Sequence, residues 1–136
     1  MSLVATALLL LSAAWLLRLA ALYVTGTVPV GYHAQLLEAL DAPQSDGLRT
    51  LMRAIYTVLA GALAASAVGI AVLALLAHGQ GASLALFGVA LVTGLSCGTA
   101  TLVLHGMERR VGPRTPWRTV AGICGLAILG LVLSLV

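Results

Sequence analysis

The chain has 136 residues, of which 61% are hydrophobic and only 8% are charged. In a soluble domain about a quarter of the residues are charged, so this composition excludes an ordinary water-soluble fold. The net charge of +3 comes from seven arginines and no lysine. Because these arginines follow the pattern of a membrane topology, nucleic acid is not expected as a partner. We expect a single all-α domain, residues 1–136, that spans a membrane.

The first apolar run extends over residues 3–24 and contains one charged residue, Arg18. At 1.5 Å per residue this length crosses the roughly 30 Å hydrocarbon core, which predicts transmembrane span one. The run lacks the basic start of a secretory signal, which favours a helix that is retained. Snorkelling to the headgroups explains the position of Arg18; the alternative is an inward-facing side chain paired with Glu108 or Glu38.

Residues 25–47 form a polar segment with two prolines, three glycines and three of the four acids. Within this segment, GYHAQLLEALDA places three leucines on one side of a helix and Gln35, Glu38 and Asp41 on the other. Pro43 closes the run. The pattern predicts a short amphipathic helix at the membrane interface, between spans one and two.

The remaining spans are predicted from the apolar runs that follow. Span two covers residues 48–77, with Asp46 as its candidate N-cap. A tight connector, HGQGAS, leads to the uncharged span three, residues 84–104. After the polar loop HGMERRVGPRTPWR, span four covers residues 119–136. Four crossings of this kind form two helical hairpins.

The arginines predict the orientation of these spans. Six arginines lie on the side of the loops that follow spans one and three: Arg49, Arg53, Arg109, Arg110, Arg114 and Arg118. Arg18 lies in the half of span one nearest to that side, and the opposite side has none. Under the positive-inside rule this side is cytoplasmic, and both termini are non-cytoplasmic. The bias toward Ala, Leu, Gly and Arg favours a bacterial cytoplasmic membrane.

The arginine side also carries the candidate binding residues. Arg49 and Arg53 are four residues apart, so they share a helix face and can bind a phosphate or carboxylate together. The loop arginines are typical of contacts with anionic lipid headgroups; an acidic surface of a cytoplasmic partner is the alternative. Candidate anion or headgroup contacts are Arg49, Arg53, Arg109, Arg110, Arg114 and Arg118. A candidate polar pocket comprises Arg18, His33, Glu38, His105 and Glu108.

Aromatic side chains are expected at the same boundary. Trp117 lies at the start of span four, and Tyr23, Tyr32 and Tyr56 lie near the same level. Tryptophan and tyrosine are enriched where the membrane meets water. The four residues therefore predict an aromatic belt on the arginine side.

Neither a metal nor a cofactor is expected. The histidines and acids have no HxxxH or ExxH spacing on any predicted helix. Cys97 and Cys124 lie inside apolar runs at matching depths, so they are expected to pack as small apolar residues. A thiol pair or a disulfide between them is the alternative.

Small residues recur at four-residue steps in three spans. They are Gly61, Ala65 and Gly69 in span two, Gly94 and Gly98 in span three, and Ala121, Gly122 and Gly125 in span four. Such faces let helix backbones approach closely. The sequence leaves open whether the partner helix belongs to this chain or to another.

No catalytic motif is present: the chain has no acid pair within a span, no nucleophile elbow and no P-loop. Compact four-helix drug exporters need a carboxylate within the membrane, and the predicted spans lack one. The topology is similar in outline to that of membrane-associated enzymes of eicosanoid and glutathione metabolism. Their pattern of arginine, asparagine and glutamate is not reproduced in LRTLMRAIYTVLAG, so membership is not expected.

We therefore expect a non-catalytic accessory or scaffolding subunit of a larger membrane complex. Its expected partners are the lipid bilayer, anionic headgroups on the cytoplasmic face and other membrane subunits. One alternative is a homo-oligomeric channel or carrier, with a polar lining of Ser66, Thr93, Ser96, Thr99 and Thr101. The other is an enzyme that acts on lipid or thiol substrates at the cytoplasmic boundary, through Arg49, Arg53, Glu108 and Arg109.

Overall fold

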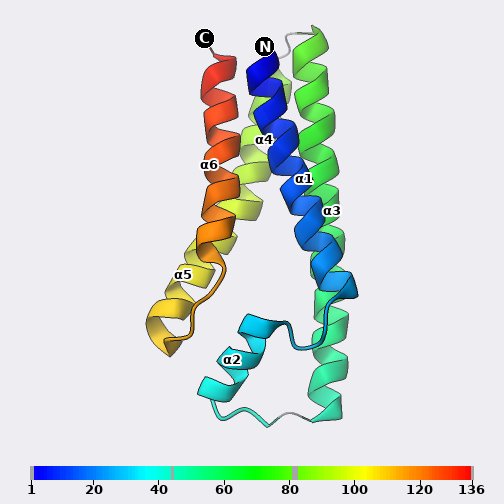
Figure 1. Cartoon of the computed structure of the whole chain (residues 1–136). Coiled ribbons are helices and arrows are strands. Elements are labelled where there is room, and N and C mark those ends of the chain that lie inside the picture. Colours follow the sequence, from blue (N-terminus) through cyan, green and yellow to red (C-terminus); the bar gives the residue numbers. More distant parts are fainter. Residues whose placement is uncertain (1, 44, 81–82, 136) are drawn as a thin grey trace.

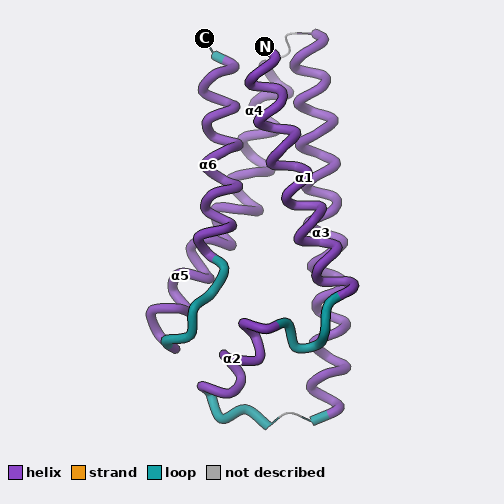
Figure 2. The backbone as a smooth tube through the Cα atoms, in the orientation of Figure 1, coloured by secondary structure: helices purple, strands orange, loops and turns teal. Residues whose placement is uncertain are grey.

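The computed structural model describes residues 2–43, 45–80 and 83–135. Every regular element among them is a helix, which confirms the expected all-α class (Figures 1 and 2). In chain order these are α1 (Leu3–Thr25), α2 (Gly31–Ala39), α3 (Asp46–Gln80), α4 (Ser83–Thr93), the π-helical turn η1 (Gly94–Gly98), α5 (Thr99–Val111) and α6 (Trp117–Ser134).

Four helices are long and apolar enough to cross a membrane, as predicted. They are Leu3–Thr25, Asp46–Gly79, Ser83–Val111, which joins α4, η1 and α5, and Trp117–Ser134. This length and composition are those of membrane-spanning helices. The 35 residues of α3 extend over about 52 Å, more than the roughly 30 Å hydrocarbon core. Helix α3 is therefore longer than a single crossing requires. Residues 81–82 of the expected HGQGAS connector and residue 136 of expected span four lie outside the described residues.

Helix α3 begins at Asp46, one residue earlier than an N-cap at Asp46 would predict. The hydroxyl of Ser45 accepts a hydrogen bond of 3.2 Å from the backbone N–H of Leu48, so Ser45 is the N-cap. Asp46, the expected N-cap, is instead the first residue of the helix. Its carboxylate there still complements the positive end of the helix dipole.

The third long helix ends later than expected. It continues beyond residue 104 to Val111, because Met107, Glu108, Arg109 and Arg110 are good helix formers although most of them are not apolar. The helix stops where Gly112 adopts a φ of 95°, a conformation that glycine takes at no steric cost.

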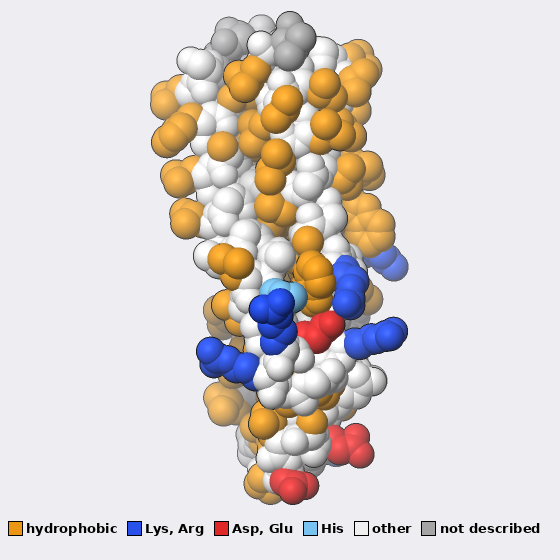
Figure 3. All heavy atoms as spheres, turned by 90° about the vertical axis from the view of Figure 1, so that its left-hand side faces the viewer, with side chains coloured by type: hydrophobic (Ala, Val, Ile, Leu, Met, Phe, Trp, Pro, Cys, Tyr) orange, Lys and Arg blue, Asp and Glu red, His pale blue; other side chains and the backbone are white. Residues whose placement is uncertain are grey.

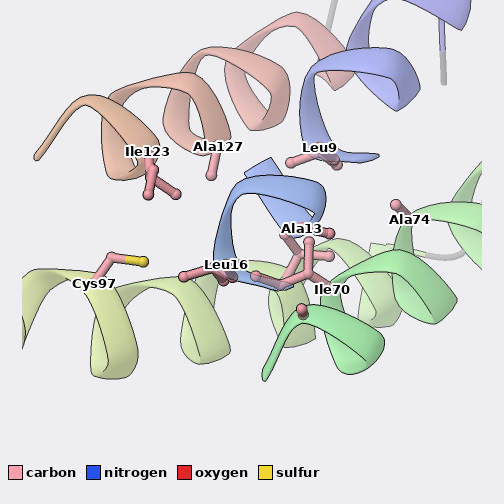
Figure 4. Close-up of a cluster of buried hydrophobic side chains, with 10 residues drawn as sticks. Leu9, Ala13, Leu16, Ile70, Ala74, Cys97, Ile123 and Ala127 are labelled. Atoms are coloured by element: carbon pink, nitrogen blue, oxygen red, sulfur yellow. The ribbon is translucent and has the colours of Figure 1, made fainter. Parts of the chain in front are cut away.

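The helices pack closely at the end of the molecule where both described chain ends lie (Figure 1). Helix α1 lies between α3 and α6 and contacts both. Figure 4 shows the buried side chains gathered around α1. They are Leu9, Ala13 and Leu16 of α1, Ala67, Ile70 and Ala74 of α3, Val89 of α4, Cys97 of η1, and Ile123 and Ala127 of α6. We call this region, around residues 3–16, 67–79, 83–93 and 123–134, the packed half, and Cys97 lies at its edge.

Two glycines allow the closest approaches in the packed half. A Cβ atom at Gly88 would lie 2.9 Å from Cδ1 of Leu73, and one at Gly130 would lie 3.1 Å from the Leu9 side chain. These positions hold α4 against α3 and α6 against α1. The glycines of the sequence repeats make no such contact. A Cβ atom at any of them would meet no side chain or neighbouring helix of the described chain within 4 Å. They are Gly61, Gly69, Gly94, Gly98, Gly122 and Gly125.

The helices separate toward the other end of the molecule (Figures 1 and 2). Helix α4 packs on α3, whereas α5 packs on α6. The turn η1 lies between α4 and α5, and π-bulges are a common cause of helix bending. We call this region, around residues 17–25, 31–63, 96–111 and 117–122, the splayed half.

Candidate functional site

The charged side chains gather in the splayed half. On the face shown in Figure 3, arginine, acidic and histidine side chains all lie in the lower part, and the upper part shows hydrophobic and neutral atoms. At the opposite end of the bundle, Oγ1 of Thr6 and Nδ1 of His78 are 3.0 Å apart. Because most charged side chains lie in the splayed half, a polar binding site or active site is expected there.

A cluster of aromatic rings docks α2 onto α1 and α3. The hydroxyls of Tyr32 and Tyr23 are 2.8 Å apart. Tyr56 is 2% exposed; its hydroxyl accepts a 3.2 Å hydrogen bond from the Val30 N–H and also hydrogen-bonds Nδ1 of His33. The Tyr56 ring lies 5.2 Å from both the Tyr23 and the His33 rings, measured between centroids. Hydrogen bonds and ring contacts together fix α2 in place.

The groups of α2 in this cluster are neutral near pH 7. Burial, and then the hydrogen bond to Tyr23, raise the pKa of Tyr32 well above its ordinary value. Burial lowers the pKa of His33 below its ordinary value of 6.5. The cluster therefore suits positioning of α2 better than binding of an anion.

A second polar group fixes the connection between α5 and α6. Oε2 of Glu108 accepts a 3.0 Å hydrogen bond from the Thr115 N–H, and Oε1 accepts one of 3.3 Å from Nη2 of Arg118. The buried Thr115 hydroxyl lies 3.0 Å from the carbonyl oxygen of Leu104. Both carboxylate oxygens of Glu108 thus accept hydrogen bonds from the α5–α6 connection and hold it in place, and we call this group of contacts the brace.

Two aromatic side chains pack beside this brace. The rings of His105 and Trp117 meet edge to face, with centroids 4.8 Å apart. The guanidinium carbon of Arg118 lies 4.9 Å from the Trp117 ring centroid, a cation–π distance. Nδ1 of His105 and Nε1 of Trp117 are buried and have no hydrogen-bond partner among the described residues.

The arginines do not converge on one point. Arg18 is exposed, and its guanidinium carbon lies 4.7 Å from the Trp15 ring centroid. Arg53 donates a 3.2 Å hydrogen bond to the carbonyl oxygen of Val24 at the end of α1. Arg49 near the start of α3, Arg109 and Arg110 at the end of α5, and Arg114 in the turn that follows are all exposed, and none of them pairs with an acid among the described residues. In residues 2–43, 45–80 and 83–135, the one ion pair is that between Arg118 and Glu108.

The residues of the expected polar pocket occupy separate surroundings. Arg18 stacks on Trp15, His33 belongs to the aromatic cluster, and Glu38 lies on α2 without an ion pair among the described residues. His105 and Glu108 lie one turn apart on α5; His105 packs against Trp117, and Glu108 accepts hydrogen bonds from Thr115 and Arg118. The sequence placed all five at a similar depth, but it carried no information on the direction in which each helix face points.

No group of three or more His, Cys, Asp or Glu side chains in the described parts of the chain is arranged to hold a metal ion. Cys97 is buried and Cys124 is half-buried, and both are free thiols. The three tyrosines that surround His33 were not anticipated as a unit. Their shared level in the expected aromatic belt was the available signal for this contact.

An apolar cavity of about 220 Å³ lies in the splayed half, between α1, α3, α5 and α6. Leucine, valine and alanine side chains form most of its wall, and Tyr23 and Tyr32 line part of it. The sequence pattern did not predict this cavity, because the space depends on the change of packing partner between α4 and α5.

The described side chains of the splayed half offer docking surfaces, a brace and an apolar cavity, with no nucleophile–base pair among the contacts found. Such an arrangement can bind and position other groups. No protein-family model matches the chain, and no curated protein or solved structure resembles it significantly.

Proposed function

We propose that the chain is a non-catalytic accessory or scaffolding subunit of a larger membrane protein complex. The observation that carries this proposal is a small-residue face on α3, formed by Gly61, Ala65 and Gly69, that no other described helix covers. Gly61 and Ala65 are exposed. A Cβ at Gly61 or Gly69 would meet nothing within 4 Å, so the face is open to a partner from another chain.

The shape of the α3 face suits a partner helix. Val58, 74% exposed, and the exposed Val68 and Val72 flank the small residues. Glycine and alanine between larger side chains form a shallow groove that a helix backbone can approach closely. In lipid such close contact is the main source of helix association. Lipid tails are as apolar as the side chains of the helices, so the hydrophobic effect does not favour helix contact there. Helices of this chain already use Gly88 and Gly130 in the same way.

Neither alternative has a comparable observation in its favour. Three of the hydroxyls proposed to line a channel donate to carbonyls of their own helix: Ser96 to Val92, Thr99 to Leu95 and Thr101 to Cys97. An enzyme at the cytoplasmic boundary would use Arg49, Arg53, Glu108 and Arg109, of which Arg53 and Glu108 make contacts within the chain. These two residues bond to the end of α1 and to the α5–α6 turn, respectively.

The proposed subunit has its splayed half at the cytoplasmic face of a bacterial membrane. The seven arginines of the chain support this orientation through the positive-inside rule. In this arrangement the four spans form two hairpins with both termini outside, and α2 is an interfacial helix whose buried Leu36 faces the protein. The first turns of α3 then reach past the headgroups to the cytoplasmic parts of a partner.

Photo-crosslinking in the native membrane tests this proposal. Benzoylphenylalanine replaces Ala65 on the α3 face, and a matched control replaces the exposed Phe87 on α4. We expect adducts with one foreign membrane protein at position 65 and none with that protein at position 87. Gly61→Leu should abolish the adduct and leave the fold intact, because nothing lies within 4 Å of its Cβ position. Adducts with a second copy of this chain, or with lipid alone at both positions, would refute the proposal.

A further inference from the structure

We propose that the splayed half binds one hydrocarbon chain of an anionic membrane lipid. The cavity of about 220 Å³ adjoins a second hollow of about 350 Å³ between α3 and the segment formed by η1 and α5, and five side chains line both spaces. The shared residues are Leu59, Leu63, Ser96, Ala100 and Val103. Val103 lines both spaces and is 61% exposed, so we place the mouth of the proposed groove at this residue, on the molecular surface.

The chemistry of this groove suits a saturated or isoprenoid chain. Most of its polar side chains are already bonded within the protein: Ser96 hydrogen-bonds the Val92 carbonyl and lies 3.3 Å from the Ser66 hydroxyl, and Tyr32 is paired with Tyr23. Water needs two to four polar partners, whereas a dry apolar cavity of roughly 150 Å³ is enough to bind benzene. The inner cavity is larger than that and offers no free polar partner from these groups.

The dimensions favour a single chain over a protein helix. A helix with its side chains is roughly 10 Å across, too wide for a cavity of about 220 Å³. The mouth opens between two helices of membrane-spanning composition, so the surrounding medium is lipid. A lipid tail can enter from the side without leaving hydrocarbon.

A basic side chain lies next to the mouth. Val103 also lines a third hollow, on the surface of α5, that ends at Arg110. Arg110 is exposed and has no ion pair among the described residues. It lies two helical turns, about 10 Å, from Val103 toward the end of α5. Glu108 on the same helix is engaged by Thr115 and Arg118. A phosphate headgroup above a tail in the groove therefore meets positive charge.

Labelling with a photoreactive lipid tests this proposal. The purified full chain is reconstituted in phosphatidylcholine vesicles that contain phosphatidylglycerol with a diazirine on one acyl chain, and adducts are mapped by mass spectrometry. We expect at least a fivefold enrichment on Leu63, Ser96 and Ala100 over the exposed Leu91 and Leu129, which report ordinary lipid contact. Equal labelling of both groups would overturn the proposal.

Variants separate the chain site from the headgroup site. Ala100→Phe fills the groove and should remove the enrichment at Leu63, whereas Ala90→Phe, on the exposed face of α4, should not. Val103→Trp blocks the mouth from an exposed position and gives the same test if Ala100→Phe fails to fold. Arg110→Gln should lower labelling by the phosphatidylglycerol probe several-fold and leave a phosphatidylcholine probe unchanged. Retained enrichment in both blocking variants would exclude the groove as the binding site.

Discussion

The packed half and the splayed half of the bundle are formed by the same four long helices but are held together in different ways. In the packed half, alanines and the glycines Gly88 and Gly130 let α1, α3, α4 and α6 approach closely around Leu9. In the splayed half, hydrogen bonds of Tyr32, Tyr56 and Glu108 hold the short elements, and an apolar cavity remains between the helices.

This difference gives a mostly apolar chain one closely packed region and one region with an open cavity. In lipid, burying leucine against leucine gains little over leaving it in contact with lipid tails, so fit between helices determines where they pack. In the splayed half the helices fit together less closely, and an apolar cavity remains between them. Variants that change one half at a time should reveal the contrast.

The largest effect is expected from overpacking the packed half. Gly130→Val places a side chain 3.1 Å from Leu9 and 3.2 Å from the Ala5 carbonyl oxygen, and overpacking of this kind costs about 1–3 kcal/mol. Thermal unfolding in detergent should show a lower midpoint. Gly125→Val on the same helix is the control, because nothing lies within 4 Å of its Cβ position. Equal destabilisation by both variants would contradict the packing described for α6.

A smaller effect is expected from the tyrosine pair that docks α2. Tyr32→Phe removes the 2.8 Å hydrogen bond to Tyr23, which is worth about 0.5–1.5 kcal/mol. Hydrogen exchange of the α2 amides should become faster, while exchange in the packed half stays the same. Tyr23→Phe should have the same effect, and the double variant should add little to it. Additive effects of the two variants would mean that the hydroxyls do not bond to each other.

The docking of α2 should also weaken in acid. Because burial lowers the pKa of His33 below 6.5, the folded state binds its proton less readily than the unfolded chain. The resulting stability is complete above the unfolded pKa of about 6.5 and is lost as the pH falls through the lower folded pKa. Exchange of the α2 amides, corrected for the intrinsic rate, should be faster at pH 5 than at pH 7.5. His33→Gln should abolish this difference; a difference that persists in that variant has another cause.

The smallest effect is expected at Arg18. Its exposed guanidinium stacks on Trp15, and a cation–π contact at an exposed site is worth about 0.5–1 kcal/mol. Arg18→Ala should therefore change stability by no more than this, and Arg18→Lys by less. Chemical unfolding in mixed micelles measures both. A loss of about 3–5 kcal/mol would instead indicate a buried ion pair with an acid such as Glu38.

The sequence predicted the four long apolar helices well, because length and composition determine whether a helix suits a membrane whatever it packs against. It predicted α2 from the spacing of its leucines, although the helix ends at Ala39. Asp41, with a φ of 51°, follows this end in the left-handed region, which aspartate tolerates better than most residues.

The sequence could not predict which small residues pack inside the chain. Gly61 and Gly69 have the more regular spacing, yet Gly88 and Gly130 make the close contacts. The rotation of each helix about its axis decides this, and near-uniform apolarity leaves no polar face to reveal that rotation. The five residues of the expected polar pocket lie apart for the same reason, and the cavity depends on the bend at η1.

The most direct test of the central claim is the mass of the intact assembly. A tagged chain is extracted in mild detergent from its own membrane and weighed by native mass spectrometry. The proposed role predicts foreign membrane chains in fixed stoichiometry with this one. A chain recovered alone, or only as copies of itself, would contradict it.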